Sequence, residues 1–263
     1  MRAYGLIAAM WIRSSMAYRA TFVMLTVGQF VITGLDFVAI WIMFGHTPQL
    51  GGFALSEVAL LYGVTTLGIG IADLLVGGIE QVGRRIRDGS LDVMLVRPVL
   101  PYIQIAADRF SLRRVGRISQ GLVVFVVALA TVDVDWTAGK VLMMPVAVLC
   151  GVVIFVDIFT LGAAFQFVAK DAAEVSNAFT YGGTTMTQYP PTIFSKEVVR
   201  AAMFVIPLAF VNWMPMLYVL DRPDPTGLPH VLRFCSPIAA AALTAVTALG
   251  WALAVRSYRS TGS

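Results

Sequence analysis

The sequence predicts an all-α integral membrane protein with six transmembrane helices. Hydrophobic residues make up 58% of its 263 residues and charged residues only 13%, whereas a soluble domain carries about a quarter charged residues. The apolar residues form long segments, and the alternating strands of about ten residues that mark an outer-membrane barrel are missing. We therefore expect one membrane domain over residues 1–263, with no soluble enzyme beside it.

Six segments are long and apolar enough to cross a bilayer, because roughly 20 apolar residues span about 30 Å of hydrocarbon. They must be helices, since lipid offers no partner for an unpaired backbone N–H or C=O. We place the spans at about 20–44, 53–76, 115–133, 140–169, 198–220 and 236–255. Pro207 and Pro215 interrupt the fifth span, and proline kinks or ends a helix. We expect its outer end to form a partly re-entrant cap, followed by an irregular loop.

The basic residues predict that both termini lie in the cytoplasm. Sixteen of the 19 lysines and arginines fall in the N-terminal arm, in the loops after the second and fourth spans, and in the tail. Lys140, Arg222 and Arg233 are the three assigned to the other side. Cytoplasmic loops carry such an excess of basic residues, so the charge indicates topology and no nucleic-acid partner is inferred.

The N-terminal arm predicts a helix lying at the cytoplasmic membrane surface. Tyr4, Trp11 and Tyr18 are spaced by seven, so on a helix they share one face. Aromatic residues with arginines nearby suit an interfacial helix. The alternative is that the first span begins early, but three arginines are too many for a span.

The sequence offers no motif for catalysis or for a resident cofactor. Its only Gly-Lys pair, Gly139-Lys140, lacks the rest of a nucleotide-binding P-loop. His46 and His230 lie in separate loops, and Cys150 and Cys235 are placed too far apart for a disulfide or a metal site. We expect no enzyme activity, no metal and no cofactor in this chain.

Polar residues within the spans are candidates for function, since an acid at membrane depth is costly. Asp36 and Asp73 lie toward the ends of spans, where pairing with an arginine or capping a neighbouring helix is the simpler explanation. Asp157 is the deepest acid, and a structural role and a place in the substrate pathway are both open for it. Asn212, between the two prolines of the fifth span, is a further candidate.

The stretch RDGSLDVMLVRPVLPY, residues 87–102, holds a short apolar run outside the spans. Asp88-Gly89 predicts a turn, and Pro98 ends the short helix that follows. On that helix Leu91 and Leu95 are four apart and share a face, with Met94 beside them and charges at the rim. The helix either enters a groove of another protein or folds back on its own bundle or the lipid surface. Spacing alone leaves both open.

The segment GSLDVMLVRPVLPY, together with NAFTYGGTTMTQYPPTIF and FVIPLAFVNWMPMLYVL, resembles the six-span permease subunits of ABC transporters of the type-2, exporter-type family. The resemblance covers nearly the whole chain and is to a bacterial branch whose substrates are mostly unassigned. It implies that the loop after the second span carries a coupling helix, which docks on a separate ATPase subunit. The positions that match this helix, with Met94 beside them, are Leu91, Asp92, Leu95, Arg97 and Pro98.

The resemblance also implies the setting of the protein: a bacterial inner membrane, two permease subunits, alike or different, and two ATPases that hold the ATP and Mg. The residues themselves leave two other classes open. A secondary transporter built from inverted three-span halves would need an ion site at the middle of the membrane. Asp157 alone is weak evidence for such a site. A membrane-embedded transferase would need a cluster of acids or histidines, and none is visible in the sequence.

Overall fold

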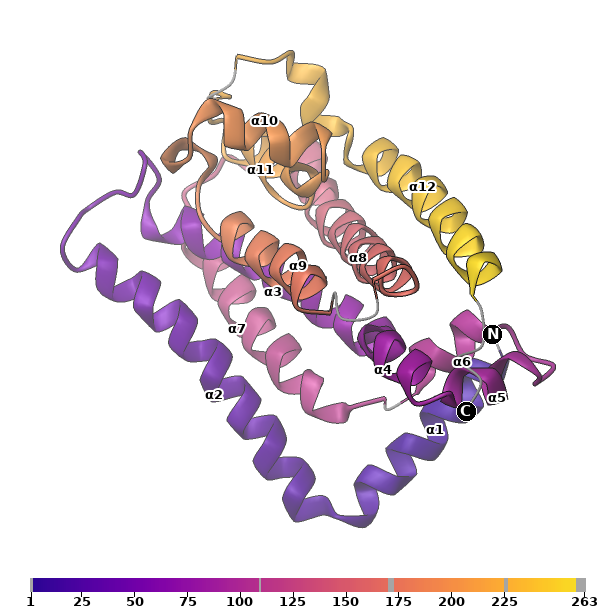
Figure 1. The fold of residues 1–263 in the computed structure, drawn as a ribbon. Helices are drawn as coiled ribbons and strands as arrows, with labels where there is room; N and C mark the ends of the chain where they lie inside the picture. Colours follow the sequence, from indigo (N-terminus) through magenta and orange to yellow (C-terminus); the bar gives the residue numbers. More distant parts are fainter. Residues whose placement is uncertain (1, 109, 170–172, 225–226, 259–263) are drawn as a thin grey trace.

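The computed structural model describes residues 2–108, 110–169, 173–224 and 227–258, and confirms the all-α class. Within these ranges the chain forms helices and no β-strand. Long helices run side by side, and short helices gather at both ends of the bundle (Figure 1).

Five helices in the described part of the chain are long and apolar enough to cross a membrane. They contain α2 (Arg19–Phe44), α3 (Leu55–Val76), α7 (Val115–Thr131), α8 (Ala138–Gln166) and α12 (Ser236–Ser257). The shorter described α-helices are α1 (Arg2–Ala17), α4 (Val82–Arg87), α5 (Ser90–Leu95), α6 (Pro101–Ala107), α9 (Ala173–Thr187), α10 (Lys196–Phe204) and α11 (Trp213–Val219). The 3-10 helices among them are η1 (Gly77–Gln81), η2 (Leu112–Arg114), η3 (Pro191–Ile193), η4 (Leu208–Phe210) and η5 (His230–Phe234).

The helix α3 is the centre of the bundle and packs against both α7 and α8. Glycines allow this approach: a Cβ atom on Gly63 would lie 2.8 Å from the Cα of Phe125 in α7. Gly68 faces Gly151 of α8 in the same way, at 3.3 Å from its carbonyl carbon. Small residues let membrane helices pack this closely, so α3 is buried on all sides.

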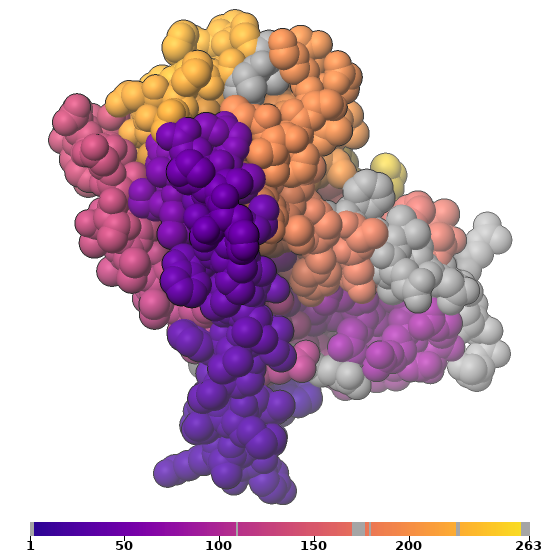
Figure 2. Space-filling view, turned by 90° about the vertical axis from the view of Figure 1, so that its left-hand side faces the viewer, coloured from indigo at the N-terminus to yellow at the C-terminus, as the bar shows by residue number. Residues whose placement is uncertain are grey.

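The helices α2 and α12 are peripheral. The helix α2 packs mainly on α7, and α12 packs mainly on α8. Both expose rows of large apolar side chains, including Ile32 and Leu35 of α2 and Leu249 and Leu253 of α12. In Figure 2 the N-terminal helices form a column whose lower part projects beyond the rest of the molecule. These faces suit contact with lipid or with another membrane subunit.

The two ends of the bundle are named here by their short helices. The α5 end holds α1, α4, α5, α6 and the last turn of α12, because Tyr4 donates to the carbonyl of Leu75 and Tyr258 donates to Asp92. The α11 end holds the loop between α2 and α3 together with α10 and α11. The N-terminal helix and the end of α12 therefore lie at the same end of the bundle (Figure 1).

The segment predicted as the fifth span is bent by 84° between α10 and the η4–α11 unit. Just before α10, Thr192 donates to the carbonyl of Gly51 at 2.7 Å. Just after α11, Arg222 binds both carboxylate oxygens of Glu57, at the start of α3, at 2.9 and 2.7 Å. Both limits of the segment thus lie near the α11 end, and the interruption expected at Pro207 falls between α10 and η4.

The helix α9 lies in the segment that was predicted as a cytoplasmic loop after the fourth span. Tyr181 in α9 reaches Glu80 near the α5 end, whereas the carbonyl of Thr187 at its last turn lies beside Thr65 of α3, farther toward the α11 end. This helix was not predicted from the sequence, because the threonines and the glutamine of YGGTTMTQ lower the mean hydropathy of the segment.

The distribution of charge differs from the prediction at two residues. Lys196 and Arg200, predicted on the cytoplasmic side, lie in α10 at the α11 end. The basic residues Arg109, Lys170 and Arg259 fall outside the described residues. The α5 end nevertheless keeps most of the arginines, including Arg84, Arg85, Arg87, Arg97, Arg113, Arg114 and Arg117.

Candidate functional site

The helix α5 lies outside the long helices and is anchored by one face. Gly89, with φ +68°, makes the sharp turn between α4 and α5, a conformation that favours glycine. Leu91 is only 1% exposed and belongs to the hydrophobic core, and Met94 packs against the same core. The side chain of Gln104 in α6 donates to the carbonyls of Met94 (2.9 Å) and Val99 (2.7 Å), which holds the loop after α5 in place.

The outward face of this region is an apolar surface, called here the α5 surface. It consists of Val93, Leu95, Val96, Arg97, Pro98 and Leu100, all exposed. Val96 is 83% exposed and Leu95 is 36% exposed. Of the two alternatives left open by the sequence, Leu91 follows the one in which the helix folds back on its own bundle, whereas Leu95 stays exposed. A six-residue helix needs an apolar anchor, and Leu91 with Met94 serves as that anchor.

The carboxylate of Asp92 joins α5 to the end of α12. Tyr258 donates its hydroxyl to Asp92 Oδ1 at 2.8 Å. Burial, and then the Asp92 carboxylate, raise the pKa of Tyr258 to about 12. The phenol therefore stays protonated and donating at physiological pH, and the position of α5 is coupled to that of α12.

A cluster of charged residues lies between α3, η1, α7 and α9 near the α5 end. Arg114 Nε pairs with Asp73 Oδ1 at 2.9 Å, and Arg117 Nη1 lies 3.9 Å from Asp73 Oδ2. Tyr181 of α9 donates to Glu80 at 3.3 Å, and the Arg117 guanidinium lies 5.9 Å from the centre of the Tyr181 ring. The simpler explanation of Asp73, pairing with an arginine, is confirmed.

A narrow polar cavity of about 100 Å³ extends from this cluster toward the α11 end, between α2, α3, α7 and α9. We call it the polar groove. It is lined by Thr33, Asp36, Thr66, Ile69, Arg117, Tyr181, Thr184, Thr185 and Gln188. Gln188 donates to Thr66 at 3.4 Å, and Asp36 and Arg117 line the same cavity. Polar groups that face one another inside an apolar bundle can pass a polar or charged molecule.

Asp36 was predicted from the sequence as a pathway candidate, whereas the residues on the α9 side of the groove were not. Tyr181, Thr184, Thr185 and Gln188 occur at positions i, i+3, i+4 and i+7, which is one face of a helix. That spacing could have indicated a polar helix face from the sequence alone. The segment was instead predicted as a loop.

Asn212 is fully buried and is not on the groove surface. Its amide Nδ2 lies 3.1 Å from the carbonyl of Leu61, 2.6 Å from Thr65 Oγ1 and 2.5 Å from the carbonyl of Thr187. The side chain therefore ties the deepest part of the α10–α11 segment to α3 and to the end of α9. Asn212 therefore holds these elements together, and none of its side chain is exposed to a molecule in the groove.

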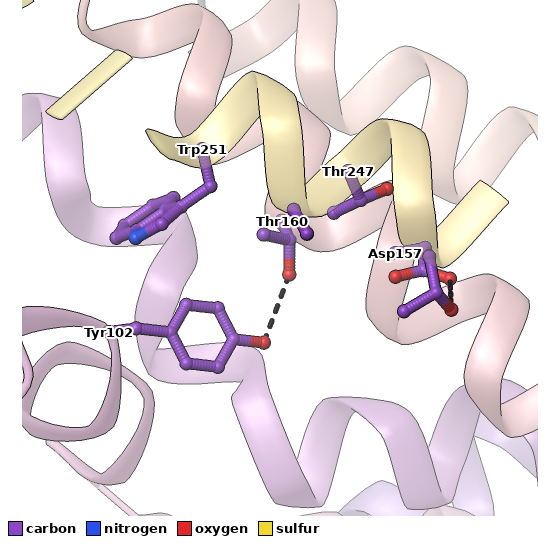
Figure 3. Close-up of a pocket in the computed structure, with 7 residues that line it drawn as sticks. Tyr102, Asp157, Thr160, Thr247 and Trp251 are labelled. Carbon is purple, nitrogen blue, oxygen red and sulfur yellow. Dashed lines mark hydrogen bonds between the residues drawn. The ribbon is translucent and has the colours of Figure 1, made fainter. Parts of the chain in front are cut away.

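Asp157 lies in a second pocket, which shares no helix with the polar groove. Its Oδ2 accepts a hydrogen bond at 2.7 Å from Thr244 of α12. The pocket is formed by α6, α8 and α12 and is shown in Figure 3. The two acids named as pathway candidates, Asp36 and Asp157, are thus not brought together.

The aromatic residues expected on one face of the N-terminal helix have different environments. Tyr4 donates to the Leu75 carbonyl at 2.7 Å, and Trp11 is half-buried. Tyr18 lies beyond the end of α1 and is 74% exposed. The turn at Tyr18 separates α1 from α2, and Figure 1 shows the two helices meeting at a wide angle there.

Within the described ranges, no group of three or more histidine, cysteine, aspartate or glutamate residues is placed to hold a metal ion. Cys150 and Cys235 are both free.

A comparison with models of protein families finds one match, described as an ABC-2 family transporter protein, over residues 30–262. No curated protein and no solved structure matches the chain.

Proposed function

Because the chain belongs to the ABC-2 transporter family, we propose that it is the membrane-spanning permease subunit of an ATP-driven exporter in a bacterial inner membrane. It is a multi-pass membrane protein, with five long apolar helices in its described part and the additional bent pair. In this proposal a separate ATPase subunit binds the ATP and Mg, and the permease uses the energy of that hydrolysis.

The observation that carries the proposal is the α5 surface. Its exposed apolar residues lie outside the long helices, at the end of the bundle with most of the arginines. An apolar helix face rimmed by charges is a common element for insertion into a groove of another protein. The proposed docking residues are Val93, Leu95, Val96, Arg97, Pro98 and Leu100, with Leu91 and Met94 as the anchor and Asp92 as the link to α12.

The same contacts suggest how docking is coupled to the membrane part. Leu91 and Gln104 join α5 to α6 and the core, and the Asp92–Tyr258 hydrogen bond joins it to α12. A displacement of α5 by the ATPase would therefore act on α6 and α12 together. Packed helices shift as rigid units on such a push.

We propose the polar groove as the transport path. A second permease subunit, identical or different, would cover its open side, since α2 offers long apolar faces next to it. The opposed charges of Asp36 and Arg117 and the hydroxyls of α9 would then contact the cargo. The charged cluster around Asp73 and Glu80 would close the path at the α5 end.

The proposed orientation places α1 along the cytoplasmic surface of the membrane, with both termini inside the cell. The α10–α11 segment then forms a re-entrant cap that faces outward. Single cysteines at exposed Gln49 and Arg200, in a chain lacking Cys150 and Cys235, should react with an impermeant thiol reagent in intact cells. A cysteine at exposed Asp88 should not. Labelling of Asp88→Cys with protection of the other two would show the opposite orientation. Protection of Arg200→Cys alone would contradict the outward-facing cap.

The test of the function is reconstitution in liposomes. The purified chain should hydrolyse no ATP above background, and ATP-driven export should appear only when its ATPase partner is added. Uphill transport driven by an ion gradient without any ATPase would contradict the proposal and favour a secondary transporter.

A further inference from the structure

The pocket around Asp157 combines an acid, hydroxyl groups and aromatic rings within the membrane part of the chain. It has a volume of about 280 Å³ and is lined by Tyr102, Asp157, Thr160, Thr244, Thr247, Ala248 and Trp251. Ligand pockets for whole drug-sized molecules span about 300–1,000 Å³. The cavity therefore fits the head of a ligand better than a complete large molecule.

The acid in this pocket has no cationic partner among the residues that the structure describes. Asp157 is buried, yet within the described residues no lysine, arginine or histidine forms an ion pair with it. Asp157 lies nine residues before the end of α8 at Gln166, roughly 13 Å along a helix that rises 1.5 Å per residue. An unpaired carboxylate at such depth is costly, so it favours a ligand that brings a positive charge.

The hydroxyl groups beside the acid are not all satisfied. Thr244 Oγ1 lies 2.7 Å from Asp157 Oδ2 and 3.0 Å from the carbonyl of Ala240, and a hydroxyl has one hydrogen to donate to these two acceptors. Thr247 is 4% exposed, and its hydroxyl lacks a hydrogen bond of normal geometry in the described chain. Both side chains line the cavity, and Figure 3 labels Thr247 on α12 near Asp157.

Aromatic rings form the other wall. Trp251 meets Tyr102 edge to face, with ring centres 5.3 Å apart, and meets Phe167 in the same way at 5.6 Å. The Tyr102 hydroxyl lies 3.1 Å from Thr160 Oγ1, as the dashed line in Figure 3 shows. These contacts hold the indole and phenol rings in place, and ring faces attract cations, ammonium groups among them.

The cavity also reaches the apolar outside of the bundle. Thr244 and Ala248 are exposed on α12, and the large side chain of Leu249 beside them is exposed as well. A molecule can therefore place its head in the cavity while an apolar tail lies against α12 in the bilayer.

We propose that this pocket binds the ammonium head of an amphiphilic amine, with Asp157 as the counter-ion, the hydroxyls of Thr244 and Thr247 as hydrogen-bond acceptors, and Trp251 as the aromatic wall. A metal ion is the less suitable cation, because one carboxylate faces mostly hydroxyls and rings there, and metal sites use several strong oxygen, nitrogen or sulfur ligands. The proposal concerns binding alone and does not depend on the proposed transport function or on the polar groove.

The experiment measures binding of radiolabelled octylamine to the purified full-length chain in a neutral detergent, with octanol as the uncharged match. Asp157→Asn should weaken octylamine binding roughly tenfold or more, which corresponds to about 1.4 kcal/mol, and leave octanol binding unchanged. Asp135→Asn, the same change at an exposed aspartate between α7 and α8, should have no effect. Trp251→Leu should weaken octylamine binding by a smaller factor, with Trp136→Leu as its control.

Two results would overturn the proposal. One is equal binding of octylamine to the unchanged chain and to Asp157→Asn, provided that both elute as single folded species. The other is sodium binding, seen by ²³Na relaxation and lost in Asp157→Asn, without specific binding of octylamine. That outcome would assign the pocket to a metal ion.

Discussion

The helices α5 and α11 look alike in the sequence and lie in opposite environments in the structure. They have six and seven residues, SLDVML and WMPMLYV, and both are mainly apolar. All of α11 except Tyr218 is buried, whereas α5 buries only Leu91. A short apolar helix that is fully enclosed stabilises its own subunit. One that leaves its apolar side open, outside the long helices, has surface to offer a partner.

The neighbours of each helix explain the difference. The α11 helix packs against α8, η4 and η5, and Asn212 ties its start to α3 and α9. The α5 helix meets mainly α4 and α6. The comparison therefore predicts that substitutions in α11 act on folding, and that substitutions on the outer side of α5 act on association.

The largest loss of stability is expected for Trp213→Ala. Trp213 is fully buried in α11, and its indole N–H donates to the carbonyl of Tyr189 at 2.9 Å. Removing a buried tryptophan typically costs about 3–5 kcal/mol. Thermal unfolding in detergent should show a clearly lower midpoint than for Trp136→Ala, because Trp136 lies exposed between α7 and α8. Equal midpoints for the two variants would mean that α11 is not part of the core.

Leu91→Ala should be the most destabilising leucine truncation in α5. Its side chain is in the hydrophobic core, and truncating a buried leucine costs about 2–5 kcal/mol. The matched variant Leu95→Ala should have a much smaller effect on the unfolding midpoint. If the two effects were reversed, Leu95 and not Leu91 would be the leucine that anchors α5 in the core.

Asn212→Ala should have an intermediate effect. It leaves the carbonyls of Leu61 and Thr187 without their amide donor, and a buried polar group that loses its partner costs about 1–3 kcal/mol. The other asparagine of the chain, Asn177, is exposed in α9, and Asn177→Ala is the control. A loss of transport in Asn212→Ala with an unchanged unfolding midpoint would contradict the tether and restore Asn212 as a pathway residue.

Hydropathy located five long helices, α2, α3, α7, α8 and α12, to within three residues at each end, because all five contain long apolar runs. At the fifth segment the structure has the bent pair of α10 and η4–α11. Its α11 part is apolar and buried in protein, whereas Phe204 and Val205 before it are exposed. The helix α9 is more polar, and its Tyr181 and Thr184 line the polar groove. Moving an apolar side chain out of water lowers the free energy whether the side chain enters the protein interior or the lipid. Composition therefore cannot separate a crossing helix from an enclosed one.

The candidate docking helix was found from the sequence, but its exposed side was not. The turn at Asp88-Gly89 and the stop before Pro98 bounded α5 correctly. The spacing of Leu91 and Leu95 placed both on one face, and a helix of six residues is too short for spacing to say which face turns inward. That choice depends on Gln104 and on the core beneath Leu91, which come from other parts of the chain.

The central claim, that the outer side of α5 docks an ATPase, is tested most directly by co-purification of that ATPase with Val96→Asp. Val96 is 83% exposed outside the long helices, so the change should alter the stability of the isolated subunit by less than about 0.5 kcal/mol. In the docked state it buries an unpaired charge, which costs a few kcal/mol and weakens binding by roughly two orders of magnitude.

Val231→Asp, at a valine 70% exposed at the α11 end, is the control. We predict normal membrane levels for both variants and loss of the ATPase from Val96→Asp alone. Full recovery of the ATPase with Val96→Asp would contradict the claim.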